Sequence, residues 1–175
     1  VKDYILRDYA KNQPSATSLT GTQNIYVNKD ATIMGAEFDM TYHMTHALDV
    51  GTQLSLTQGR NTTDNRNLSN IAPLSGNLNA KYTAQNWYTG GRFNFATEQS
   101  TVNTEYGESK TPAWSTVDLF AGYQVNKTFQ LQAGVDNLFD HAYYNYLNRT
   151  DSLTGTGYKV MEPGRNLWAR VSANF

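Results

Sequence analysis

The last ten residues, Asn166-Leu-Trp-Ala-Arg-Val-Ser-Ala-Asn-Phe175, alternate between apolar and mostly polar side chains. Leu167 and Val171 share one parity with two alanines and the terminal phenylalanine, whereas Trp168 and Arg170 share the other with Asn and Ser. Successive side chains of a β-strand point to opposite faces, so this period of two predicts a strand with one apolar and one mostly polar face.

The same period of two recurs through the rest of the chain. No stretch shows the period of about 3.6 residues that marks an amphipathic helix. The alternation therefore predicts an all-β, antiparallel fold of about eight strands. We expect them at residues 1–9, 33–44, 48–56, 77–84, 87–95, 115–125, 128–136 and 166–175.

The connections between these strands alternate in length. Tight turns are expected at residues 45–47, 85–86 and 126–127, and long polar loops at residues 10–22, 60–73, 100–112 and 147–162. An up-and-down meander of this kind has its long loops at one end and its tight turns at the other, as outer-membrane barrels do. The expected strands are also long enough to cross a bilayer, which takes about 9 to 11 tilted residues.

The distribution of side chains between the two faces favours a membrane barrel over a soluble one. A soluble barrel has an apolar interior, whereas a membrane barrel has an apolar exterior and a polar lumen. Aromatic residues lie on the apolar parity near the tight turns, as in an interfacial girdle: Tyr42, Tyr82, Trp87, Tyr123, Phe129 and Phe175. Charged residues of both signs share the polar parity, and we expect them to face the lumen: Glu37, Asp39, Lys81, Arg92, Asp118, Asp136 and Arg170.

The composition excludes several other classes of protein. The 175 residues include 14 Lys and Arg against 15 Asp and Glu, a net charge of −1 that does not favour nucleic-acid binding. The mean hydropathy of −0.60 excludes membrane-spanning helices but not spanning strands. With no Cys and only 3 His, the chain offers no thiolate and no Ser-His-Asp arrangement. We therefore expect no enzyme, no catalytic residue and no resident cofactor.

Motifs towards the C-terminus resemble TonB-dependent outer-membrane receptors. Residues 133–144 contain Asn-Leu-Phe-Asp followed by aromatic residues, as in the penultimate strand of that family, and Glu162-Pro163-Gly164-Arg165 resembles the opening of its last strand. Gly35-Ala36-Glu37 and Ile71-Ala72-Pro73 are similar to earlier strand motifs and stand in the family's order. Phe175 resembles the aromatic end of the family's assembly signal.

Within that family the chain is most similar to the copper-receptor branch. The likeness is carried by residues 1–8, 71–74 and 147–150, the last standing before the Glu-Pro-Gly-Arg motif. It implies transport of a metal ion or metal chelate, with copper favoured.

The resemblance also implies a bacterial outer-membrane location and a barrel of about 22 strands filled by a plug domain. Nothing in the chain resembles the plug or its TonB contact, so we expect residues 1–175 to be a C-terminal barrel segment of a larger receptor. It would supply lumen wall, extracellular loops and closing strand. Expected partners are outer-membrane lipid, the plug and remaining strands, TonB through the missing N-terminal part, and the barrel assembly machinery. The assembly signal would be Leu167, Val171 and Phe175.

Few side chains suit direct metal binding. His43, His141 and Met161 are weak candidate ligands, since imidazole and thioether suit copper but each residue lies alone or beside a tight turn. Asp136 and Asp140 fit a bend in a polar wall better than an acid–base pair. Two alternatives remain open: a complete small eight-strand outer-membrane barrel with an adhesin or structural role, and a soluble sugar-binding sandwich.

Overall fold

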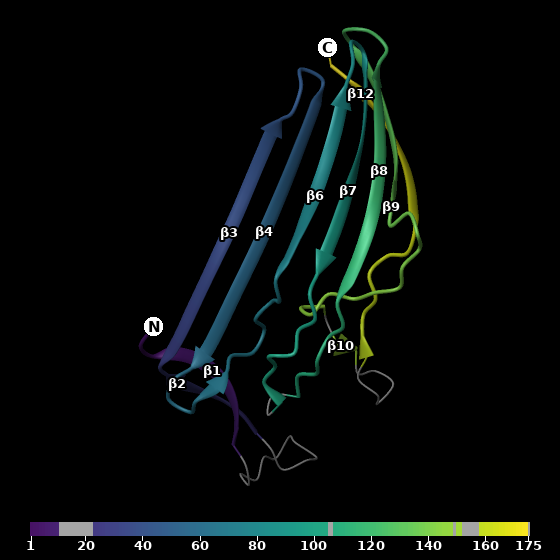
Figure 1. Cartoon of the computed structure of the whole chain (residues 1–175). Helices are drawn as coiled ribbons and strands as arrows, with labels where there is room; N and C mark the ends of the chain where they lie inside the picture. The colour runs from purple at the N-terminus through teal and green to yellow at the C-terminus, as the bar shows by residue number, and fades with distance from the viewer. Residues whose placement is uncertain (11–22, 105–106, 149, 152–157, 175) are drawn as a thin grey trace.

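The computed structural model describes residues 1–10, 23–104, 107–148, 150–151 and 158–174. Its main feature is one long, curved antiparallel sheet (Figure 1). The long strands of this sheet are β3 (Ala31–His43), β4 (Leu48–Asn61), β6 (Ser75–Thr83), β7 (Trp87–Ala96), β8 (Trp114–Gln124), β9 (Phe129–Asp136) and β12 (Asn166–Ala173).

The strands follow one another in the order β12-β9-β8-β7-β6-β4-β3, so each long strand pairs with its neighbour in the chain. The short strand β5 (Arg66–Asn67) pairs with β4 beside this path and brings the sheet to eight strands. The predicted all-β, up-and-down antiparallel fold is therefore confirmed. Within the described residues the sheet is open, because β3 and β12 end the path without pairing with each other.

The N-terminal strand differs from the expectation. A strand forms there, β1 (Tyr4–Ala10), but it pairs with β2 (Gln23–Lys29) in a separate two-stranded sheet rather than joining the main wall. The sequence prediction missed β2, which runs almost directly into β3. Paired backbone hydrogen bonds between Val1 and Ala31 (2.6 and 2.9 Å) hold the start of the chain against β3. A second small sheet, β10 (Thr150–Asp151) with β11 (Tyr158–Lys159), lies in the expected loop 147–162.

The three predicted tight turns are confirmed and lie at one end of the sheet. Backbone hydrogen bonds close them, from Met44 N to Leu48 O (2.9 Å), from Ala84 N to Trp87 O (2.8 Å) and from Val125 N to Phe129 O (3.0 Å). The described parts of the long connections and the two small sheets lie at the opposite end (Figure 1). We call these the turn end and the loop end.

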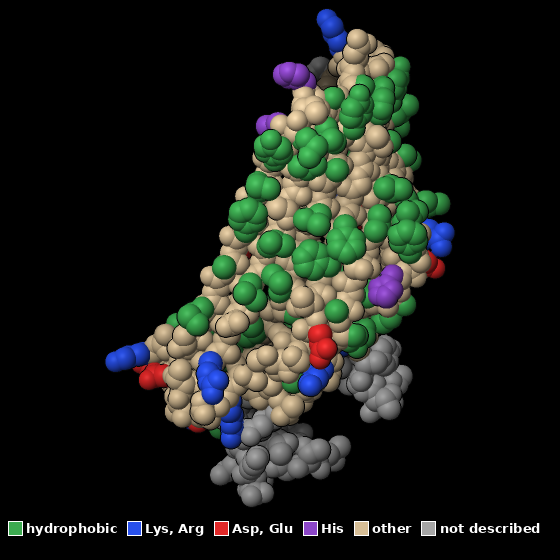
Figure 2. Space-filling model, viewed as in Figure 1, with side chains coloured by type: hydrophobic (Ala, Val, Ile, Leu, Met, Phe, Trp, Pro, Cys, Tyr) green, Lys and Arg blue, Asp and Glu red, His purple; other side chains and the backbone are tan. Residues whose placement is uncertain are grey.

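One face of the main sheet is apolar and exposed (Figure 2). Among the described residues only four apolar side chains are buried: Ala31, Leu68, Ala96 and Tyr146. On the apolar face Phe38 is 51% exposed and Leu167 is 77% exposed. An exposed apolar surface of this extent marks a surface that contacts lipid or protein rather than water. The sheet therefore has no soluble-protein core on this side.

Aromatic residues gather on the apolar face near the turn end, as predicted. Tyr82 and Trp87 flank one tight turn with ring centroids 5.5 Å apart, and Trp87 pairs with Tyr123 across the next strand. Phe129 follows the last tight turn. Such rings are favoured where hydrocarbon meets water, so their position is that of an interfacial girdle.

Candidate functional site: the polar face

The opposite face of the sheet is polar and concave. All seven charged residues expected to face a lumen share this face by register; Arg92 is opposite Asp118, and Asp136 is opposite Asn166. Residues of β6 and β12 line one cavity although three strands separate them in the sheet. The polar face must therefore curve inwards between these strands.

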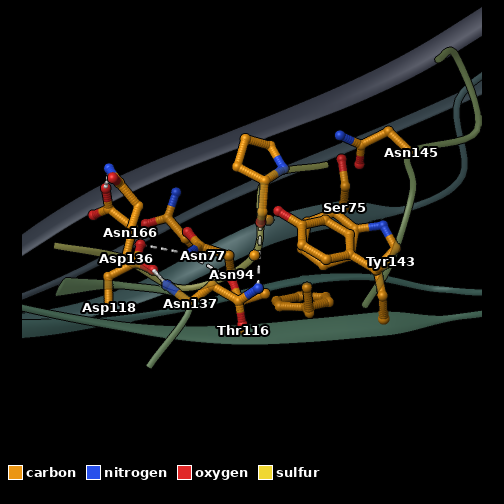
Figure 3. Close-up of a pocket in the computed structure, with 15 residues that line it drawn as sticks. Ser75, Asn77, Asn94, Thr116, Asp118, Asp136, Asn137, Tyr143, Asn145 and Asn166 are labelled. Atoms are coloured by element: carbon orange, nitrogen blue, oxygen red, sulfur yellow. Dashed lines mark hydrogen bonds between the residues drawn. The ribbon is translucent and has the colours of Figure 1, made fainter. Parts of the chain in front are cut away.

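This cavity has a volume of about 530 Å³ and lies near the loop end (Figure 3). The carboxylate of Asp118 accepts hydrogen bonds from Asn94 Nδ2 (2.8 Å) and from the backbone N of Asn137 (2.9 Å). The carboxylate of Asp136 accepts bonds from Trp168 Nε1 (3.2 Å) and from Asn166 Nδ2 (3.3 Å). Both carboxylates are therefore held in place by neighbouring strands.

A ladder of polar side chains crosses three strands of the same face. Gln53 Nε2 donates to Asp39 Oδ2 (2.7 Å), Asn77 Nδ2 donates to Gln53 Oε1 (2.9 Å), and Asn79 Nδ2 donates to Asn77 Oδ1 (3.2 Å). The bonds fix the amide orientations of Gln53 and Asn77, because each of these two amides accepts with its oxygen and donates with its nitrogen.

Towards the turn end the polar face carries basic and aromatic groups. A second cavity of about 500 Å³ is lined by Lys81 and Arg92 together with the same two carboxylates, Asp118 and Asp136. Lys81 Nζ lies 4.7 Å from the centroid of the Tyr88 ring, and the Tyr88 hydroxyl accepts a bond from Gln132 Nε2 (2.8 Å). Alternation places Tyr88 on this face, but the sequence does not predict its contacts with Lys81 and Gln132.

The Asn-Leu-Phe-Asp motif after β9 forms a clamp on the start of β12. Asn137 is buried, and its amide both accepts from His141 N (2.9 Å) and donates to His141 O (2.9 Å). Asp140 Oδ1 accepts from Arg165 N (2.8 Å), and a Cβ on Gly164 would lie 2.6 Å from that same oxygen. Asn137 (φ 51°) and Asp140 (φ 55°) have left-handed backbones, which Asn and Asp tolerate best among residues with side chains. Asp140 therefore has a structural role in holding Arg165, and Asp136 accepts hydrogen bonds from side chains of the polar face. Both findings agree with the structural interpretation that the sequence favoured.

Glu108 joins the long connections at the loop end. Its two carboxylate oxygens accept bonds from Asn70 N (2.7 Å) and Asn103 N (2.9 Å). Tyr146 is buried beside it; burial first, and then the Glu108 carboxylate, raise the pKa of Tyr146 above its usual range. The Lys159 amino group lies 4.3 Å from the Tyr146 ring centroid and donates to its carbonyl oxygen. Three loops thus meet at one carboxylate that sequence reasoning did not identify.

The weak metal-ligand candidates are not brought together. His43 Nδ1 lies 2.6 Å from Asp49 Oδ1 at the turn end, where both side chains are exposed. His141 and Met161 lie at the loop end, the latter 51% exposed. In the part of the chain that the structure describes, no three His, Cys, Asp or Glu residues are grouped to hold a metal ion. His43 cannot share a metal with the other two candidates.

Two of the three expected assembly residues are described. Leu167 and Val171 are 77% and 68% exposed on the apolar face of β12, which is an edge strand of the sheet. Phe175 lies outside the described residues. The backbone of an edge strand can pair with another strand, which is the physical basis of a strand-recognition signal.

Long antiparallel strands, an exposed apolar face with an aromatic girdle and a concave polar face define a segment of a transmembrane β-barrel. The described residues contain no helix that is long and apolar enough to cross a membrane. The family model described as TonB dependent receptor-like, beta-barrel matches residues 1–138, and the chain belongs to this family. Its members are outer-membrane receptors of Gram-negative bacteria, which gives the chain its location.

Solved structures of several receptors match the fold. The copper transporter OprC superimposes with a TM-score of 0.88 and 29% identity over 99% of this chain and 28% of that chain. For a ferric enterobactin receptor mutant of Pseudomonas aeruginosa, the TM-score is 0.71 and the identity is 19%, over 99% of this chain and 27% of that chain. For the ferric yersiniabactin uptake receptor FyuA of Yersinia pestis, the TM-score is 0.69 and the identity is 13%, over 86% of this chain and 25% of that chain.

The chain thus spans between about a quarter and three tenths of the length of these receptors. At 13% and 19% identity, the two ferric receptors support the fold alone. Curated protein sequences gave no significant match.

Proposed function

We propose that this chain is the C-terminal barrel segment of a TonB-dependent receptor that moves a metal ion or metal chelate across the outer membrane, with copper the favoured cargo. One observation carries the choice of cargo. The copper transporter OprC matches this chain at 29% identity and a TM-score of 0.88. Seven structures of siderophore receptors match it less well, at identities of 13 to 21% and TM-scores of 0.66 to 0.71.

In this proposal residues 1–175 supply lumen wall, extracellular loops and closing strand. The apolar face contacts outer-membrane lipid, and the polar face with its seven charged residues contacts water and the plug domain. The plug and remaining strands come from the rest of the receptor, which also contacts TonB. The barrel assembly machinery recognises β12 through Leu167, Val171 and Phe175.

The structure gives less support to a complete eight-strand barrel with an adhesin or structural role. Eight strands suffice to close a barrel. In the described residues, however, β1 leaves the main wall and β3 and β12 remain as open edges. A wall with two open edges fits a segment of a larger barrel better.

Copper accumulation in cells tests the proposed cargo. Deleting the gene of the full-length receptor from its host should lower cellular copper several-fold during growth on limiting copper, and expression from a plasmid should restore it. A strain that lacks TonB should lose the effect of the plasmid, because TonB energises the transport. Unchanged copper accumulation, together with loss of growth on a ferric siderophore, would replace copper by an iron chelate as cargo.

A further inference from the structure

The edge strand β12 has no tight turn to set its register on β9. Residues 137–165 join the two strands, whereas β8, the other neighbour of β9 in the sheet, is joined to it by a tight turn. In a hairpin, the type and length of the turn fix which residues lie opposite each other. Yet β12 pairs with β9 without a break, from Asn166 opposite Asp136 to Ala173 opposite Phe129. Other contacts must therefore set this register.

The alternation of side chains excludes only some of the other registers. A slip of one residue would turn every side chain of β12 to the other face, and Leu167 and Val171 would then lie on the polar side. A slip of two residues keeps each side chain on its own face and moves the strand by about 7 Å along its neighbour. The pattern of faces therefore does not distinguish the observed register from one that is shifted by two residues.

The ring of Trp168 fits at only one position of β9. Trp168 lies opposite Gly134, and a Cβ on that glycine would be 2.4 Å from Trp168 Cζ2. Gly134 is the only glycine of β9. A slip of two residues would place the indole opposite Gln132 or Asp136, both of which carry side chains on the same face. The ring therefore favours the observed register over both shifted ones.

Two hydrogen bonds to one carboxylate favour the same register. Asp136 accepts them from Trp168 Nε1 (3.2 Å) and from Asn166 Nδ2 (3.3 Å), and Asn166 lies directly opposite it (Figure 3). In either shifted register at least one of these donors would be carried about 7 Å away from the carboxylate. The loss of that bond adds to the clash of the indole.

A compact turn directly after β9 holds the residues that lead into β12. Asp140 N donates to Asn137 O (2.9 Å) and closes the turn. The carboxylate of Asp140 accepts from Arg165 N (2.8 Å), and Asn137 Nδ2 donates to the carbonyl oxygen of Pro163 (3.4 Å). Gly164 leaves room for the carboxylate, since a Cβ there would lie 2.6 Å from Asp140 Oδ1. The start of β12 is therefore fixed beside the end of β9, whatever the conformation of the long connection between them.

From these contacts we infer that the turn at residues 137–140 and the Trp168–Gly134 pair form a register lock, which takes the place of a hairpin turn and positions the free edge of β12. This edge is an interaction surface, and the partner that it fits is another β-strand. A barrel closes only with a fixed stagger of its strands, so a slip in β12 would be passed on to the strand that pairs with it. The inference rests on the proposed role of β12 as the closing strand and is independent of the cargo.

Disulfide formation in the full-length receptor, with any other cysteine replaced by serine, reports the register directly. Ala133→Cys combined with Ala169→Cys reports the observed register, and Ala133→Cys combined with Leu167→Cys or Val171→Cys reports a slip of two residues. Cysteines whose Cα atoms are more than about 7 Å apart cannot be bridged without movement of the backbone. With the lock intact, oxidation of outer-membrane fractions should cross-link the first pair and leave the other two largely unlinked.

The double variant Asp140→Gly, Trp168→Ala removes the lock, and glycine avoids strain at the φ of 55°. The share of slipped cross-links should rise about tenfold or more, which is the effect of losing one hydrogen bond to a charged group. Asp140→Asn keeps an acceptor oxygen and should stay within about twofold of wild type. Asp39→Ala is the control, because it removes a hydrogen-bonded carboxylate between β3 and β4, which a tight turn joins.

Heat-modifiable folded barrel is measured for every variant. A well-folded double variant that forms only the cross-link of the observed register would overturn the inference, and so would an equal rise of slipped cross-links in Asp39→Ala. If the double variant inserts poorly, Ala133→Cys with Ala169→Cys should restore insertion, because the disulfide sets the register covalently in the oxidising periplasm. Absence of this rescue would overturn the inference as well. A wild-type receptor that moves no copper would overturn the proposed cargo and leave the cross-linking result standing.

Discussion

Gly90 of β7 lies directly opposite Phe120 of β8, and the phenylalanine ring fills the space that a side chain on Gly90 would need. A Cβ at Gly90 would stand 2.6 Å from Phe120 Cζ and 2.5 Å from the carbonyl oxygen of Ala80. The arrangement recurs on the polar face in two more cross-strand pairs, Tyr88 with Gly122 and Trp168 with Gly134. Aromatic rings paired with glycines are a known way to stabilise a curved sheet.

Gly90→Ala should therefore destabilise the barrel, whereas Gly91→Ala should be tolerated. The new methyl group at Gly90 meets backbone, so the cost should be about 1–3 kcal/mol. At Gly91 the nearest atom is the mobile Cδ2 of Leu119 at 3.2 Å, and the cost should stay below about 1 kcal/mol. Urea unfolding of the full-length receptor in detergent measures both, and equal effects of the two substitutions would contradict the prediction.

Glu108→Ala should loosen the loop end as a unit. Loss of the two hydrogen bonds to the backbone amides of Asn70 and Asn103 removes about 1.5–3 kcal/mol for each bond to a charged acceptor, before relaxation. Hydrogen exchange should accelerate at least about tenfold at both amides, in loops far apart in sequence. Glu98→Ala, which removes an exposed carboxylate after β7, serves as the control. Faster exchange in only one of the two loops would argue against a shared carboxylate anchor.

The loop after β4 should respond to acid. The hydrogen bond from Asn61 Nδ2, followed by that from Lys29, lowers the pKa of Asp64 below its ordinary value of 3.8. Because the folded state favours the carboxylate, its contribution is present above pH 3.8 and is lost as the pH falls through the lowered pKa. Exchange of the amides of residues 61–66, corrected for intrinsic rate, should rise in that range. Asp64→Asn should remove the acid step; an unchanged step would assign it to another group.

Deleting Phe175 should lower insertion of the full-length receptor into the outer membrane. The expectation rests on β12 being an edge strand whose Leu167 and Val171 are exposed on the apolar face. Leu167→Asn should act in the same direction, and Ser172→Asn, on the polar face of the same strand, should have little effect. The amount of heat-modifiable barrel in outer-membrane fractions measures each. Normal levels after the deletion would show that the terminal aromatic residue is dispensable.

The alternation of apolar and polar residues predicts most of the strands of the fold. Residues 33–44, 48–56 and 166–175 read as strands because a period of two leaves no other regular structure, and β3, β4 and β12 lie there. The pairing of the N-terminal segment could not be predicted in the same way. Residues 1–9 also read as a strand, but alternation does not say which strand is the partner, and β1 pairs with β2 outside the main wall.

By itself the sequence determined which side chains share a face, since parity is a local property of the backbone; Asp118 and Asp136 could be placed on the polar side without coordinates. Only the tertiary structure decided what surrounds them. The curvature that brings β6 near β12, and the loop that carries Tyr143 to the same cavity, depend on contacts between residues distant in sequence. The same holds for Glu108, whose partners Asn70 and Asn103 lie on two different loops that meet only when the sheet sets their ends side by side.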